Sequence, residues 1–234
     1  MTDGVERIPI IAFDGNHRAG KGTQIRLLEA FLVRGGLHPY RLRGDGSRTG
    51  AGMDCSDPYS EWWQEFKANL KSFENEYDAW RIGARRLLAE AAVKFTCISS
   101  DSNAVLLFDR SYLSRAQMTL KEGLDLSHAN MYFGQGENVV DDGIIDATKP
   151  DLVVYLDAPS HVLTGRLTQT DPKFDFRNHN IINSEDYFEE AFASLIGFGE
   201  NIVKLDGDQP PEQVFECVRD VIITQNILNR TDIQ

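Results

Sequence analysis

The stretch FDGNHRAGKGTQ, residues 13–24, has the residue types needed to hold a phosphate group. It follows the apolar run IPIIA and contains the pattern Gly15-x-x-x-x-Gly20-Lys21. Glycines let the backbone curl so that several N–H groups point inward, and the following helix adds its N-terminus. Lys21 can then reach the terminal phosphates of a nucleotide. The pattern predicts a phosphate-binding loop made of Gly15, Asn16, His17, Arg18, Ala19, Gly20, Lys21, Gly22 and Thr23.

The residue directly after Lys21 is Gly22, where phosphate-binding loops usually carry a serine or threonine that ligates magnesium. The next hydroxyl, Thr23, comes one place later. The order Gly-Lys-Gly-Thr resembles the loop of adenylate-kinase-like enzymes, which favours nucleotide kinases over GTPases and motor ATPases. We expect Mg²⁺ to be held by phosphates and waters, with Thr23 or Asp109 as a protein ligand.

A second group of charged residues ends the apolar run NAVLLFDR, residues 103–110. The run indicates a strand of a parallel sheet that is buried on both faces. Ligands of such sheets bind at the carboxyl ends of the strands, so Asp109 and Arg110 are candidate site residues. The alternatives are a plain strand-end carboxylate and a surface arginine.

Strand patterns alternate with helix patterns along the chain. Strands are expected over 7–15, 38–44, 103–110, 150–159 and 200–207, and helices over 23–36, 59–95, from 161 onward and over 210–228. This alternation predicts an α/β fold with a parallel sheet of about five strands and helices on both faces. The length of 234 residues suits a single domain, 1–234.

The composition excludes several classes of protein. A net charge of -12 and a pI near 4.8 disfavour binding to nucleic acid, although a local basic cluster can still hold a small phosphorylated ligand. A mean hydropathy of -0.34 without a long apolar run argues against a membrane span. No signal-peptide pattern opens the sequence, and the three cysteines lie far apart, so we expect a cytoplasmic protein with reduced thiols.

Several motifs, taken together, resemble the thymidylate kinase family of nucleoside monophosphate kinases. LLFDRS is similar to the family's strand that ends in Asp-Arg, and FDGNHRAGKGTQ to its loop F-E-G-x-D-x-A-G-K-[ST]-T-Q. EYDAWR, KPDLVVYLDAP and NIVKLDGDQPPEQV resemble further segments in the same order. The resemblance implies a P-loop kinase three-layer fold with a short lid at about 168–180. It also implies ATP and Mg²⁺ as cofactors, a small nucleotide substrate and a homodimer.

The resemblance also implies roles for single residues on the acceptor side. Arg110 and Arg43 would hold the acceptor's phosphate, because a guanidinium binds two oxygens at once. Tyr77 would stack on the base and Arg81 would hydrogen-bond to it, although both could instead belong to a packed or solvated helix face. Asp14 and His17 would also face the acceptor, His17 at the position of an acidic residue that contacts the sugar.

On the ATP side, the resemblance implies a catalytic set made of Lys21, Arg18, Asp109 and Arg110. Arg18 would place positive charge on the transferring phosphoryl group, where charge stabilisation is most of the catalysis. Asp109 would organise Mg²⁺ or its waters. Three further residues would contact ATP, and they are Arg166, Lys173 and Arg177.

The departures from the family pattern fall on the acceptor side. His17 replaces an acidic residue, and RLRGDGSRTG replaces the family's T-R-E-P-G-G loop. The expected activity is therefore ATP-dependent phosphorylation of a nucleoside monophosphate, with dTMP as the first candidate. The alternatives are a kinase for another acceptor, such as a deoxynucleoside, a modified nucleotide or another small metabolite, and a non-catalytic ATP-binding regulator.

Overall fold

The centre of the fold is a parallel sheet of five strands in the order β2-β3-β1-β4-β5. The computed structural model describes residues 8–16, 18–43, 101–111, 113, 120, 150–170 and 201–228. The strands are β1 (Ile10–Gly15), β2 (His38–Arg43), β3 (Ala104–Asp109), β4 (Leu152–Asp157) and β5 (Ile202–Asp206). All five predicted strands are confirmed, each within three residues of the predicted bounds.

The three helices among the described residues are α1 (Lys21–Arg34), α7 (Ser160–Thr170) and α9 (Pro211–Thr224). α1 begins at Lys21, two residues before the predicted start, because Gly20 turns the chain with a left-handed φ of 104°. Residues 168–170 of the predicted lid continue α7, and the rest of that lid lies outside the described residues. The predicted helix over 59–95 also lies outside them.

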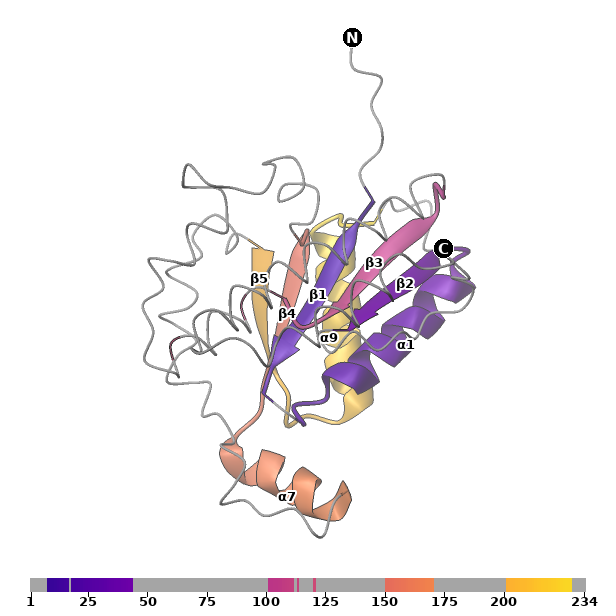
Figure 1. The fold of residues 1–234 in the computed structure, drawn as a ribbon. Coiled ribbons are helices and arrows are strands. Elements are labelled where there is room, and N and C mark those ends of the chain that lie inside the picture. The colour runs from indigo at the N-terminus through magenta and orange to yellow at the C-terminus, as the bar shows by residue number, and fades with distance from the viewer. Residues whose placement is uncertain are drawn as a thin grey trace, which may run out of the picture.

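Strand register brings the chemically important residues to one edge of the sheet. β1 lies between β3 and β4, and Phe13 pairs with Asp109 while Gly15 pairs with Leu156. The parallel strands therefore end together, at the lower edge of the sheet in Figure 1, and α7 lies beyond that edge. Polar residues that follow β1 and β3 must consequently lie close to one another.

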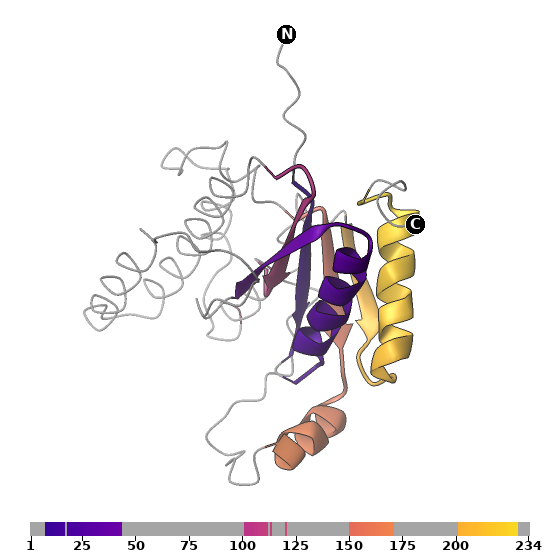
Figure 2. The same ribbon diagram turned by 90° about the vertical axis from the view of Figure 1, so that its right-hand side faces the viewer.

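The main core joins one face of the sheet to α1 and α9, which Figure 2 shows on the same side of the strands. Alternate strand residues such as Ile11, Phe13 and Leu107 are fully buried there. They pack against apolar residues of α1 and α9 spaced at helical intervals. The side-chain amide of Gln24 donates a 2.9 Å hydrogen bond to the Pro211 carbonyl, which holds the N-terminal ends of the two helices together.

Side chains on the opposite face of the sheet are buried as well. Ile10, Leu106, Phe108 and Tyr155 have no exposed surface. The central strands are therefore covered on both faces, as a parallel sheet requires. The helices expected on this second face lie outside the described residues.

Gly15 is the point where β1 passes into the phosphate loop. Its φ is 126°, and a β-carbon there would collide with the carbonyl oxygen of Leu156 on β4. Only glycine combines this φ with so close a strand neighbour. The loop therefore leaves the sheet in one fixed direction.

We expect Gly15→Ala to lower the free energy of unfolding by about 3 kcal/mol or more, because it adds a backbone clash to an unfavourable φ. Gly36→Ala is the matched control, since Gly36 has a φ of 81° but open space around its Cα. The control should lose only about 1 kcal/mol. Urea unfolding of both variants gives the comparison, and equal losses would contradict the role of the Leu156 contact.

Candidate phosphate-binding site

The loop between β1 and α1 presents backbone N–H groups at the start of a helix. Arg18 and Gly20 have left-handed φ values of 68° and 104°, and the Ala19 N–H donates to the Asn16 carbonyl at 3.2 Å. Gly20 is the N-cap of α1 and gives it no side-chain cap, and the first turn holds no acidic residue. The positive end of the helix dipole therefore faces the loop, as an anion site requires.

Lys21 lies folded under this loop. Its side chain is buried, and Nζ donates to the carbonyl oxygens of Gly15 at 2.9 Å and Asn16 at 2.7 Å. Burial, assisted by the positive charge of Arg110, lowers the pKa of Lys21 to about 7, while Asp109 and Asp14 act in the opposite direction. The ammonium group is thus poorly solvated, and a phosphate bound beside it would raise the pKa of Lys21 again.

The backbone after β3 is fixed by a carboxylate of β1. Asp14 is fully buried, and its Oδ2 accepts hydrogen bonds from the Ser111 N–H at 2.9 Å and from the Ser111 hydroxyl. Arg110, between Asp109 and Ser111, has a φ of 84° and donates its N–H to the Phe13 carbonyl at 2.9 Å. The contacts of Asp14 therefore give it a structural part in holding Arg110 at the sheet edge.

Arg41 of β2 is a site residue that the sequence reasoning missed. Its side chain is only 6% exposed, and Nη2 forms a 3.0 Å ion pair with Oδ2 of Asp109. A methyl group built on Gly22 would lie 3.7 Å from the same Nη2. Arg43, which the sequence favoured, pairs with Asp109 through the register of the strands. The Arg43 side chain lies outside the described residues.

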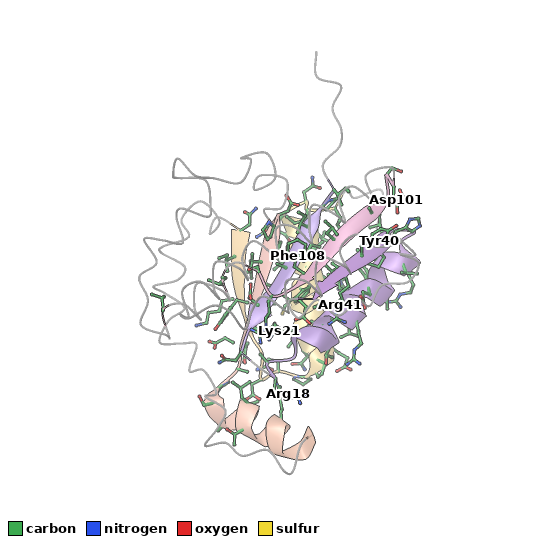
Figure 3. The ribbon with its side chains drawn as sticks, viewed as in Figure 1. Arg18, Lys21, Tyr40, Arg41, Asp101 and Phe108 are labelled. Carbon is green, nitrogen blue, oxygen red and sulfur yellow. The ribbon has the colours of Figure 1, made fainter. Side chains whose placement is uncertain are left out.

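Arg166 of α7 connects two loops at the same edge. Its guanidinium donates to the Arg18 carbonyl at 3.3 Å and to the Gly207 carbonyl at 2.8 Å, between β5 and α9. Figure 3 shows Arg18 between the sheet and α7, with Lys21 at the start of α1 and Arg41 on β2 nearby. The Arg166 side chain therefore links α7 to the phosphate loop and to the turn between β5 and α9.

Many of the predicted site residues meet at this edge. The contacts and strand register described above bring together the phosphate loop, Asp14, Asp109, Arg110 and Arg166. The predicted residues that lie outside the described parts of the chain are His17, Tyr77, Arg81, Lys173 and Arg177. Their placement stays a prediction.

Two kinds of feature are absent from the described parts of the chain. No group of three or more His, Cys, Asp or Glu side chains there has the geometry to hold a metal ion. No helix in those same ranges is long and apolar enough to cross a membrane.

Comparison with known proteins identifies the fold. No protein-family model matches the chain, and no curated protein matches it in sequence. Among solved structures, thymidylate kinase from Candida albicans matches with a TM-score of 0.57 and 16% sequence identity, over 94% of this chain and 93% of that chain. The chain has a thymidylate-kinase-like P-loop fold. At 16% identity the similarity establishes the fold, and the Candida enzyme is described as having broad substrate specificity.

The lowered pKa of Lys21 predicts a pH dependence of stability. Between about 7 and the ordinary value of 10.5, the unfolded chain binds a proton that the native lysine lacks, so the free energy of unfolding rises with pH. The free energy of unfolding of the ligand-free protein, minus that of Lys21→Met, should rise by about 1 kcal/mol per pH unit from pH 7.5 to 9.

Urea unfolding at several pH values measures this difference. Arg34→Met, at the exposed end of α1, is the control and should run parallel to the unchanged protein. A Lys21→Met curve that also runs parallel would show that Lys21 titrates close to its ordinary value.

Proposed function

We propose that this protein is a kinase that transfers the γ-phosphoryl group of ATP to a nucleoside monophosphate, with dTMP as the first acceptor to test. The observation that carries the proposal is the phosphate loop itself, with Lys21 under it and Arg110 at the end of the neighbouring strand. The thymidylate-kinase-like fold supports the same activity. A kinase of this kind needs a triphosphate site and an acceptor site at one sheet edge.

The chemistry of the proposed reaction is positioning and charge neutralisation. The loop N–H groups and Lys21 hold the β- and γ-phosphates, and Arg18 adds positive charge beside the group that is transferred. Arg110 holds the acceptor's phosphate so that an oxygen can attack in line. A bond forms between that oxygen and the γ-phosphorus. The bond between the γ-phosphorus and the β–γ bridging oxygen breaks, and its electron pair leaves with ADP.

The side chains present fit magnesium in part. Asp109 ends β3 at the correct edge and Thr23 supplies a hydroxyl, whereas the helix position directly after Lys21 is glycine. When bound, Mg²⁺ neutralises phosphate charge. We therefore assign the ion mainly to the phosphates of ATP, with Thr23 and Asp109 as the protein groups that would help to hold it.

Further parts of the proposal rest on the sequence. The resemblance implies a lid at about 168–180 with Lys173 and Arg177, contacts from Arg43, Tyr77 and Arg81 to the acceptor, and a homodimer. The chain length suits a single kinase domain over 1–234, and the widely spaced cysteines favour a cytoplasmic location.

Lys21→Ala should lower kcat/KM by a factor of about 10²–10³, because one preorganised charge is lost from the transferring phosphates. The assay is ADP release with ATP, Mg²⁺ and dTMP. Arg34→Ala, exposed at the far end of α1, is the matched control and should keep full activity. Equal activity of the two variants would contradict the proposed site.

The acceptor itself is tested with dTMP, dUMP, UMP, CMP, AMP, GMP and thymidine in the same assay. We expect turnover with dTMP. Turnover with thymidine and not dTMP would identify a nucleoside kinase. ATP binding without turnover on any of these acceptors would favour the alternative of a non-catalytic ATP-binding regulator.

A further inference from the structure

The ion pair between Arg41 and Asp109 has no role in the proposed function as stated above. It lies where β2 and β3 end, under the first turn of α1. The Arg41 guanidinium is almost completely removed from water, while the Asp109 side chain is 23% exposed. One partner is therefore buried and the other faces the edge where the phosphates would bind.

Stability alone does not explain this arrangement. A buried ion pair often gives no more stability than apolar side chains of the same volume, because both charges lose their hydration. Gly22 is the second residue of α1, so the guanidinium also lies next to the positive end of the helix dipole. A cation is unfavourable there unless Asp109, or an anionic ligand, offsets its charge.

The Arg41 guanidinium lies close to the position that, in most phosphate-binding loops, is filled by the side chain of the residue after the lysine. The residue after the loop lysine normally points a hydroxyl at the metal, and here that residue is Gly22. Nη2 of Arg41 lies 3.7 Å from where the β-carbon of such a residue would be. The same Nη2 holds Asp109, the carboxylate that would be the other protein group near the metal.

We propose that Arg41 is a positioning residue of the phosphate site, a resident cation that holds Asp109 and offsets phosphate charge on the side where the loop lacks a hydroxyl ligand. This inference rests on the proposed function, since it concerns the same site. While Arg41 is present, the negative charge of Asp109 is neutralised and does not repel the triphosphate. ATP binding therefore depends less on magnesium than in a loop that relies on the ion.

The experiment measures the Kd of ATP by calorimetry, once with Mg²⁺ and once with EDTA. For the unchanged protein, the two values should lie within about tenfold. In Arg41→Gln, the Kd in EDTA should rise at least about tenfold further, because Asp109 then repels the phosphates. The Kd with Mg²⁺ should change by less than about threefold, since the ion compensates the freed carboxylate.

Three further variants separate charge from structure. Arg41→Lys keeps the cation and should restore metal-free binding to within about threefold of the unchanged protein. Arg34→Gln, at an exposed arginine at the end of α1, should change neither Kd. If Arg41→Gln fails to fold in urea and circular dichroism measurements, Asp109→Asn gives the reverse test, because it leaves the cation without its carboxylate while an amide oxygen can still accept a hydrogen bond. Its Kd for ATP in EDTA should fall at least about tenfold.

The outcomes distinguish this inference from the proposed function. Equal weakening with and without Mg²⁺, or no weakening, would make Arg41 a structural residue and overturn the inference alone. A metal-free Kd that Asp109→Asn leaves unchanged would do the same. An unchanged protein that binds ATP under neither condition would overturn both the inference and the proposed function.

Discussion

Positive charge held out of water at one edge of the sheet is the constraint on which the rest of the structure depends. Lys21 and Arg41 are both buried there, and Arg110 lowers the pKa of Lys21 further. Such charges repel one another and lose hydration, so they need fixed partners. The loop carbonyls and the carboxylates of Asp14 and Asp109 supply that compensation, and the parallel register brings all of them to the same edge.

The local positive edge also reconciles two properties that oppose each other. The chain carries a net charge of -12, yet the proposed ligands are polyanions. A phosphate that reaches this edge meets low-dielectric surroundings, helix N–H groups and three cationic side chains at short range, where the distant acidic surface is screened. The net negative charge of the chain therefore repels an extended polyanion such as a nucleic acid more effectively than a small phosphorylated ligand.

The sequence predicted the strands well because their apolar runs are continuous, as in VLLF and LVVYL, and such runs suit only a buried parallel sheet. The phosphate loop was predictable because the spacing of its glycines and lysine fits one backbone conformation, the curled loop that binds phosphate. Arg41 was not predictable. In HPYRLR, apolar and polar residues do not alternate clearly enough to define a buried face, and a charged residue of an edge strand is normally exposed. The register pairs Asp109 with Arg43, so the approach of Arg41 to Asp109 is seen only in the ion pair between their side chains. The acceptor stays a prediction because His17 and the segment after Arg43 lie outside the described residues, and their sequence shows no hydrophobic period from which a geometry could be inferred.

The backbone conformation at two arginines lowers the stability of the folded chain. Among the described residues, the non-glycine positions with positive φ are Arg18, Arg110 and Asn226. Glycine would relax the backbone at the first two by about 1 kcal/mol each, and asparagine tolerates the left-handed region better than arginine does. An engineer who selected only for thermal stability would therefore replace both arginines early. At these two positions, the residue that gives the most stable chain therefore differs from the residue that binds an anion best.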